Sequence, residues 1–135
     1  MMYKKFMLRA IEISLNDQNE VPVGCIVVHD GRIISEASNR VEKYNNSLLH
    51  AEMIAIYQAT RKLNSKFLTD CIMFCTMEPC DMCKAAIRLS RIKEVIFGVY
   101  QNDLIKSKCT FIGGICEEKC KANINQFFLM RRNKI

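Results

Sequence analysis

The stretch CIMFCTMEPCDMC, residues 71–83, predicts a strand that passes directly into a helix. The apolar run Cys71–Met77 is the strand, and a helix is expected over Cys80–Ser90. Pro79 stops the strand from running on and sets the entry geometry of the helix, because proline has a fixed φ and no N–H group. A strand followed at once by a helix is a building unit of a layered α/β domain.

The segments on either side alternate in the same way. Apolar residues at helical spacing predict an amphipathic helix over residues 2–16. The run Val21–Val28 is apolar on both parities, as in a strand buried on both faces, and Asp30-Gly31 accepts the positive φ of a hairpin turn. The other expected elements are a partner strand over Arg32–Ala37, a polar loop over 38–49, a helix over His50–Leu63, strands over Glu94–Val99 and Cys109–Ile115, and a last helix over Glu117–Arg132.

This order predicts a three-layer α/β fold that starts with a hairpin and continues with parallel crossovers. The length of 135 residues fits one domain, residues 1–135. No apolar run approaches the ~20 residues of a membrane span, so no membrane-spanning segment is expected. Charges interrupt the start of the chain, so no signal peptide is expected and a cytoplasmic location is predicted. The net charge of +6 suits a polyanion such as RNA, but only as a weak signal.

Eight cysteines in a chain without an export signal favour reduced thiols or a metal site over disulfides. Cys80 and Cys83 are three residues apart at the start of a helix, so their sulfurs face the same way, and the helix N-terminus favours the thiolate form. His50 opens another helix. A metal ion between the two helix N-termini would have His50, Cys80 and Cys83 as ligands and Glu52 beside it.

Three ligands leave a position for water, as in catalytic zinc sites, although a fourth cysteine could close the site. Zinc lowers the pKa of its water towards ~7, and Glu52 is the candidate to accept and deliver the proton. A lone Cys-x-x-Cys could also be a redox pair or a structural site. Together with His-x-Glu and the proline before the first cysteine, it is the pattern of zinc deaminases that act on bases.

The remaining cysteines have simpler interpretations. Cys25, Cys71 and Cys75 fall in predicted strands and are expected to be small core residues. Cys116 and Cys120 are four residues apart and are expected to share a helix face, where core packing or a free thiol is favoured over a second metal site.

Several segments outside the metal motif carry a family resemblance. They are Glu20-Val21-Pro22-Val23-Gly24, Asn39-Arg40, Ser90-Arg91-Ile92, Phe97-Gly98 and FFLMRR at 127–132. With the metal motif, they make the chain resemble the bacterial tRNA-specific adenosine deaminases, within the cytidine and deoxycytidylate deaminase superfamily. The resemblance implies a cytidine-deaminase-like α/β/α fold with a five-stranded mixed sheet, Zn²⁺ as cofactor and a homodimer. The implied substrate is the wobble adenosine in a tRNA anticodon loop, converted to inosine.

The same resemblance implies the substrate contacts. Asn39 would hydrogen-bond the flipped base, and the backbone around Val21 and Ala51 would line its pocket. Phe128 would lie along the RNA with the last two arginines of the tail, Arg131 and Arg132. Aromatic rings stack on splayed bases and arginines pair with phosphates, but Phe127 or Phe128 could instead dock the last helix.

Two segments depart from the family pattern: Ser47-Leu48-Leu49 stands before the metal histidine, and residues 101–108 replace a family-typical stretch. Two other functions therefore stay open. The first is a deaminase of a free base or nucleoside such as cytosine, guanine or cytidine. The second is a non-catalytic, zinc-stabilised RNA-binding protein, although a structural site does not need the Glu52 carboxylate.

Overall fold

The computed structural model describes residues 2–100 and 113–132. The chain divides into two compact units, Met1–Asn102 and Asp103–Ile135, which are described separately. The expectation of a single domain over residues 1–135 stays a prediction. No helix of the described residues is long and apolar enough to cross a membrane.

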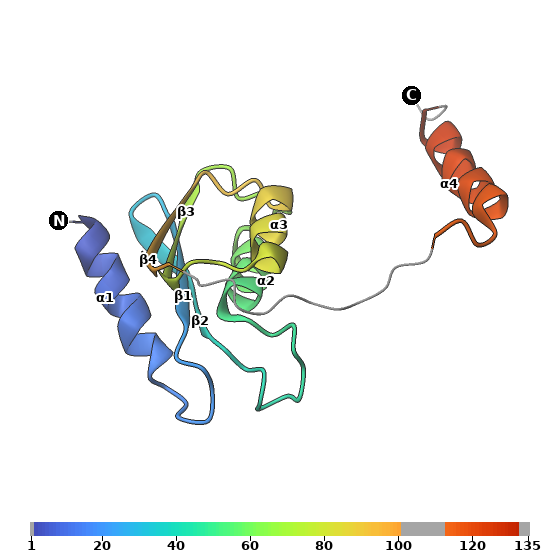
Figure 1. The fold of residues 1–135 in the computed structure, drawn as a ribbon. Helices are drawn as coiled ribbons and strands as arrows, with labels where there is room; N and C mark the ends of the chain where they lie inside the picture. Colours follow the sequence, from blue (N-terminus) through green and yellow to red (C-terminus); the bar gives the residue numbers. More distant parts are fainter. Residues whose placement is uncertain (1, 101–112, 133–135) are drawn as a thin grey trace. The chain divides into compact units, whose positions relative to one another are not determined.

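The first unit is a three-layer α/β/α arrangement (Figure 1). Helix α1 covers one face of the sheet, and helices α2 and α3 cover the other. The strand order is β2-β1-β3-β4, in which β1 pairs antiparallel with β2 and β3, while β3 and β4 are parallel. The elements are α1 Met2–Ser14, β1 Gly24–His29, β2 Arg32–Ser38, α2 Ala51–Leu63, β3 Cys71–Met77, α3 Asp81–Leu89 and β4 Glu94–Val99.

The sheet of the described residues has four strands, so the expectation of five is not met there. The expected fifth strand was placed at Cys109–Ile115. Residues 109–112 lie outside the described residues, and 113–115 form no strand. The hairpin and the parallel crossover agree with the predicted order, and Asp30 and Gly31 have the positive φ values of 51° and 75° expected of the turn.

Strand β1 lies at the centre of the core, and its predicted burial on both faces is confirmed. Cys25 and Val27 pack under α2, whereas Ile26 and Val28 face α1, because successive side chains of a strand point to opposite faces. Burying one of the valine or isoleucine side chains of this strand stabilises the fold by about 1.5–3 kcal/mol.

The predicted start of this strand, at Val21, is wrong. Strand β1 begins at Gly24, because Pro22 has no N–H for a ladder and the N–H of Val23 donates to the carbonyl of Val21 at 2.8 Å. Gly24 itself is required by close packing. A Cβ there would lie 2.0 Å from the carbonyl oxygen of Ala10 in α1.

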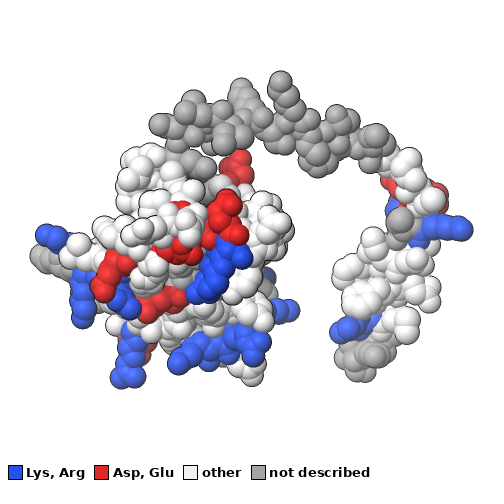
Figure 2. Space-filling model, turned by 90° about the horizontal axis from the view of Figure 1, so that it is seen from below, with Lys and Arg blue, Asp and Glu red and all other residues white. Residues whose placement is uncertain are grey.

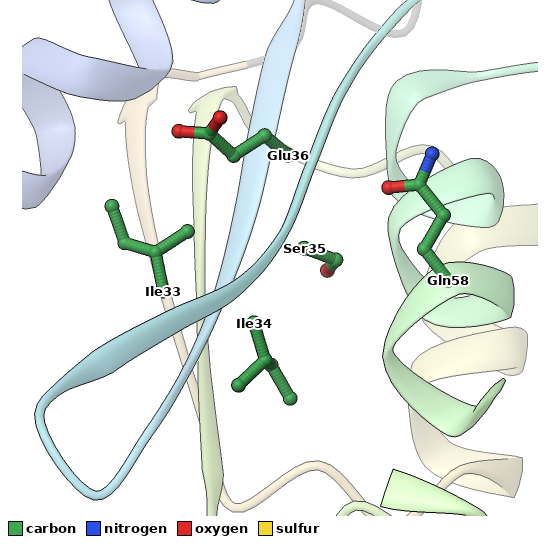
Figure 3. A pocket seen from close by; sticks show the side chains of 5 residues that line it. All are labelled: Ile33, Ile34, Ser35, Glu36 and Gln58. Atoms are coloured by element: carbon green, nitrogen blue, oxygen red, sulfur yellow. The ribbon is translucent and has the colours of Figure 1, made fainter. Parts of the chain in front are cut away.

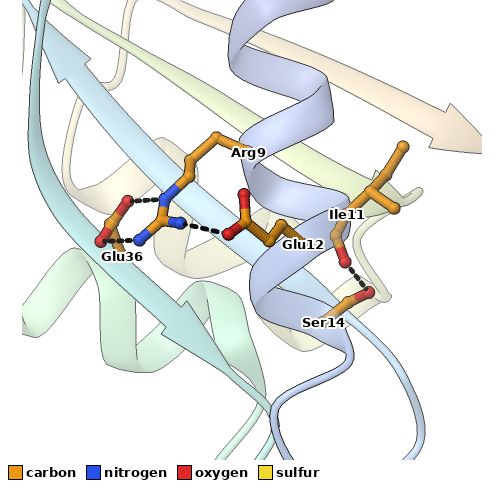
Figure 4. A network of polar contacts seen from close by, with 5 residues as sticks. All are labelled: Arg9, Ile11, Glu12, Ser14 and Glu36. Atoms are coloured by element: carbon orange, nitrogen blue, oxygen red, sulfur yellow. Dashed lines mark hydrogen bonds and ion pairs between the residues drawn. The ribbon is translucent and has the colours of Figure 1, made fainter.

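A polar contact fastens α1 to the edge strand β2 (Figure 4). The guanidinium of Arg9 donates two hydrogen bonds to the Glu36 carboxylate, at 2.6 and 3.1 Å, and also pairs with Glu12 at 3.0 Å. Such a bidentate pair fixes the orientation of both side chains. It therefore sets how α1 lies along the sheet.

In residues 113–132, the part of the second unit that the structure describes, there is one helix, α4, over Glu117–Arg132, with the bounds that the sequence predicts. Cys116 precedes this helix with a φ of 53°, so the expectation that it shares a helix face with Cys120 is wrong. A residue with left-handed backbone lies outside a regular α-helix.

Candidate metal centre

Two helices begin at the candidate centre with the same local geometry. His50 is the N-cap of α2 with φ −69° and ψ 151°, and Cys80 is the N-cap of α3 with φ −69° and ψ 173°. Neither side chain caps its own helix with a hydrogen bond. Both side chains are therefore available to a ligand at the electropositive ends of the two helices.

The three predicted ligands come together. Nδ1 of His50 lies 3.6 Å from Sγ of Cys80 and 3.6 Å from Sγ of Cys83, and all three atoms lie within 4.8 Å of one another. Tetrahedral zinc with Zn–N of about 2.0–2.1 Å and Zn–S of about 2.3 Å would separate nitrogen from sulfur by roughly 3.6 Å. The two nitrogen–sulfur distances therefore match those of a tetrahedral zinc site. Among the described residues, no fourth histidine, cysteine or carboxylate completes this group.

Glu52 is placed beside the ligands and is buried. Its Oε1 has no hydrogen-bond partner, alone among the buried side-chain oxygens and nitrogens of the described residues. Burial raises the pKa of this carboxyl above its ordinary value. A buried carboxylate oxygen without a partner destabilises the fold, so its presence calls for an explanation. A role as proton carrier next to a metal-bound water would be one.

The Cys83 thiol stays protonated unless a cation is bound. Burial raises its pKa far above the ordinary value, and the nearby Glu52 carboxylate raises it further. The protein alone therefore does not favour a thiolate at this position. A bound divalent ion reverses this balance, because a coordinating thiol is deprotonated.

Asn39 and Ala51, two of the predicted substrate contacts, lie together. The side-chain oxygen of Asn39 accepts the backbone N–H of Ala51 at 2.8 Å, and the N–H of Asn39 donates to the carbonyl of Val23 at 3.3 Å. The oxygen of Asn39 is thus used within the protein, which leaves its NH₂ group to donate to a ligand.

Val21 and the tail residues are more exposed than Asn39 and Ala51. Val21 is well exposed on the segment before β1. Phe128, Arg131 and Arg132 lie on α4 in the second unit, where Phe128 is about half exposed and contacts Phe127 edge-on at 5.4 Å between ring centroids. Their predicted role along the RNA stays a prediction.

The cysteines of the sheet are core residues, as expected. Cys25, Cys71 and Cys75 are fully buried. Cys25 and Cys75 are direct partners on the antiparallel strands β1 and β3, with their sulfurs 3.3 Å apart. Burial raises the pKa of the Cys25 thiol well above its ordinary value, so this thiol stays protonated.

Glu20 has a role that sequence reasoning missed. Its carboxylate is buried and accepts two backbone N–H groups of the loop before His50. The sequence offers one signal, an acidic residue just before the apolar Val21-Pro22-Val23 run, but the partners are backbone groups and leave no trace in the sequence.

Among the described residues, the hollow beside β2 and the charges on one face of the first unit do not point to another site. A hollow of about 410 Å³ lies between β2 and α2 (Figure 3), and none of its lining residues belongs to the metal group. In the view of Figure 2, basic and acidic side chains are interspersed over the first unit. Charge on that face therefore defines no single binding surface.

Residues 2–99 match the family model described as the cytidine and deoxycytidylate deaminase zinc-binding region. The tRNA-specific adenosine deaminase of Aquifex aeolicus is 52% identical over 81 residues, which are 60% of this chain and 54% of that protein. This chain thus matches about half the length of that relative. The enzyme of the same name from Bacillus subtilis is 32% identical over 132 residues, 87% of this chain and 82% of that protein.

Two solved structures show the same fold. One, from studies of A-to-I editing by tRNA:A34 deaminases at the wobble position of transfer RNA, has a TM-score of 0.71 and 33% identity over 74% of each chain. The other, guanine deaminase from Bacillus subtilis, has a TM-score of 0.80 and 26% identity over 100% of this chain and 96% of that one.

Proposed function

The chain belongs to the cytidine and deoxycytidylate deaminase family, and from this premise we propose that it deaminates adenosine to inosine at the wobble position of tRNA. The observation that carries the proposal is one arrangement. Nδ1 of His50 lies at zinc spacing from the sulfurs of Cys80 and Cys83, and the partnerless carboxylate oxygen of Glu52 is buried beside them. A structural metal site has no use for that carboxylate.

The proposed reaction replaces the exocyclic amine of the base by a carbonyl, with water consumed and ammonia released. Zinc held by His50, Cys80 and Cys83 would lower the pKa of a bound water, so that a hydroxide nucleophile is available at neutral pH. Glu52 accepts the proton lost by the attacking water and delivers it to the ring nitrogen N1. The Glu52 carboxylate then takes the proton of the newly added hydroxyl group and delivers it to the amine, so that the carbonyl forms as ammonia leaves. A raised pKa suits this shuttle, because it lets the group hold a proton between the two steps.

The remaining groups of the site orient the base. The NH₂ group of Asn39 donates to an acceptor atom on the base, while its bond to Ala51 holds it in place. The base must first leave its stack, which costs a few kcal/mol and is least costly in a single-stranded loop. An anticodon loop meets this condition.

A tRNA substrate is supported by the names of the relatives and by the FFLMRR tail. By the same reasoning we propose that Phe128, Arg131 and Arg132 contact the RNA, that the protein acts as a homodimer, and that it works in the cytoplasm, where tRNA is modified. These three points are open to direct measurement by crosslinking, sedimentation and fractionation.

A free purine is the second candidate substrate. The observation in its favour is the likeness to guanine deaminase from Bacillus subtilis over the whole of this chain. The same metal centre and the same glutamate would serve that reaction. The two candidates differ in whether polynucleotide is needed for turnover.

One experiment separates these functions. The zinc-loaded protein is incubated with an anticodon stem-loop carrying A at the wobble position, and separately with guanine, cytosine and cytidine, and inosine and ammonia are measured. Inosine in the stem-loop, absent when wobble A is replaced by G, is the expected result. Turnover of guanine with none on RNA would refute the tRNA proposal, and no turnover of any substrate would favour a binding protein.

A further inference from the structure

A buried carboxylate outside the metal centre joins the segment before β1 to the loop between Asn39 and His50. Glu20 is 8% exposed, and its two carboxylate oxygens accept the backbone N–H groups of Glu42 and Lys43 at 3.0 and 2.9 Å. Two charge-assisted hydrogen bonds to one carboxylate fix both the distance and the orientation of the segments they join.

The segment that carries Glu20 is held by its own short-range bonds. The N–H of Asn19 donates to the side chain of Asp17 at 2.9 Å, and the N–H of Glu20 donates to the carbonyl of Asp17 at 3.3 Å. After Glu20, the N–H of Val23 bonds back to Val21. These bonds hold the backbone at Glu20 in place, and the carboxylate therefore fixes the position of its two partners.

The partner is the loop of residues 40–49, whose ends are anchored independently of Glu20. The N–H of Arg40 donates to the carbonyl of Leu49 at 3.0 Å, and the neighbouring Asn39 is bonded to Ala51. Among the described residues 2–100, two hydrogen bonds join the middle of this loop to another segment, and Glu20 accepts both of them. Bonds inside the loop, from the N–H groups of Tyr44 and Asn46 to the carbonyls of Arg40 and Val41, shape its turn. Glu20 therefore sets where this turn lies relative to the segment before β1, while the ends of the loop keep the metal ligand and Asn39 in place.

The middle of the loop presents side chains suited to nucleotides. Tyr44 and Leu48 are each 56% exposed, and the Lys43 ammonium lies 5.7 Å from the centroid of the Tyr44 ring. An exposed ring with a cation at its side stacks on unpaired bases and pairs with phosphates. Leu48 precedes His50 by two residues, so this surface lies next in the chain to the metal centre.

We propose that Glu20 is a positioning residue that holds the residue 40–49 loop in place as a contact surface for the nucleotides flanking the reacting base. The inference rests on the proposed function and adds the part of the protein that distinguishes a polynucleotide from a free base. Glu20 touches neither the base nor the ligands. Its loss should weaken substrate capture and leave the chemical step intact.

The test compares Glu20→Gln with Asp70→Asn on the anticodon stem-loop. Glutamine has the shape of glutamate but replaces one acceptor oxygen by an NH₂ group, so one loop N–H loses its partner. The expected result is a KM raised about tenfold, the size of one lost charge-assisted hydrogen bond, with kcat and zinc content unchanged within about a factor of two. Asp70→Asn removes the same charge at an exposed position outside the loop and should leave KM unchanged.

Three outcomes would overturn the positioning role: an unchanged KM, a fall in kcat at constant KM, or the same rise in Asp70→Asn. Amide hydrogen exchange at Glu42 and Lys43 supplies a reading independent of activity, and exchange must become faster in Glu20→Gln. Should that variant not fold, Glu20→Asp, which keeps both oxygens on a shorter chain, takes its place with a smaller expected rise in KM. A wild-type protein inactive on the stem-loop refutes the proposed function, whereas an active one with unchanged KM in the variant refutes only the role of Glu20.

Discussion

His50 and Cys80 occupy the same position on two different helices, and their ligand atoms, Nδ1 and Sγ, are 3.6 Å apart. Each residue is an N-cap in extended backbone conformation, and neither side chain makes a capping hydrogen bond. The lack of such a bond destabilises a helix by about 1 kcal/mol. The metal-free centre is thus less stable than two ordinarily capped helix ends, and a bound cation would offset that cost.

Cys80→Ser is expected to lose the metal. A serine hydroxyl at this position is a poor zinc ligand, and two remaining ligands do not hold the ion at micromolar concentration. Zinc content by atomic absorption should fall to near zero, and addition of zinc should no longer raise Tm. The control is Cys116→Ser, the same change at an exposed cysteine outside the metal group. Stoichiometric zinc in Cys80→Ser would show that the ligand set is wrong.

Glu52→Gln is expected to keep zinc and fold but to lose activity. The amide matches the carboxylate in shape but cannot carry a proton between water and the base, so kcat should fall by at least about 10²–10⁴-fold. Because burial raises the pKa of the Glu52 carboxyl, the charged form is costly in the folded protein. Tm of the metal-free variant should therefore not decrease. Unchanged kcat would contradict the assigned role.

Stability should fall as pH rises above the ordinary thiol pKa, partly because of Cys71. Burial raises the pKa of this thiol above its ordinary value of 9.0. The unfolded chain therefore releases the Cys71 proton before the folded protein does, which favours unfolding at high pH. The contribution of protonated Cys71 to the free energy of unfolding is fully present below pH 9 and decreases above it. Urea unfolding between pH 8 and 10 should show a shallower decline in Cys71→Ala than in the wild type, and parallel declines would exclude this contribution.

Gly24→Ala is expected to destabilise the first unit. The added Cβ would lie 2.0 Å from the carbonyl oxygen of Ala10 and 2.9 Å from the backbone nitrogen of Ser14, so α1 must move away from β1. Overpacking of this kind costs about 1–3 kcal/mol. Gly113→Ala, where an added Cβ meets nothing within 4 Å, is the matched control. Equal Tm values for the two variants would show that α1 adapts freely.

Much of the fold follows from local patterns. The apolar run Cys71–Met77 is strand β3 with the bounds predicted, and Asp30-Gly31 forms the turn. Where a prediction failed, the cause is a competing backbone effect. Val21 satisfies the pattern of a strand, but the proline after it removes a ladder donor and the segment turns instead.

Some features of the candidate centre also follow from the sequence, whereas others do not. Ligand types, their number and the acidic partner follow from His50, Glu52 and the Cys-x-x-Cys spacing, because these depend on chemistry and on a few residues of helix. The sequence does not show that Asn39 bonds to Ala51 or that Cys25 lies opposite Cys75, since strand register and loop path set both contacts.

The sequence by itself thus determined the kind of chemistry, through residue types at short spacings on predictable helices. Tertiary structure alone decided three things: how closely the two helix N-caps, 30 residues apart, approach each other, that the Glu52 oxygen stays without a partner, and that Glu20 is bonded to the 40–49 loop. The physical reason is that short spacings are governed by local backbone geometry. Contacts between distant segments depend on how the helices pack on the sheet and on backbone groups that every residue carries.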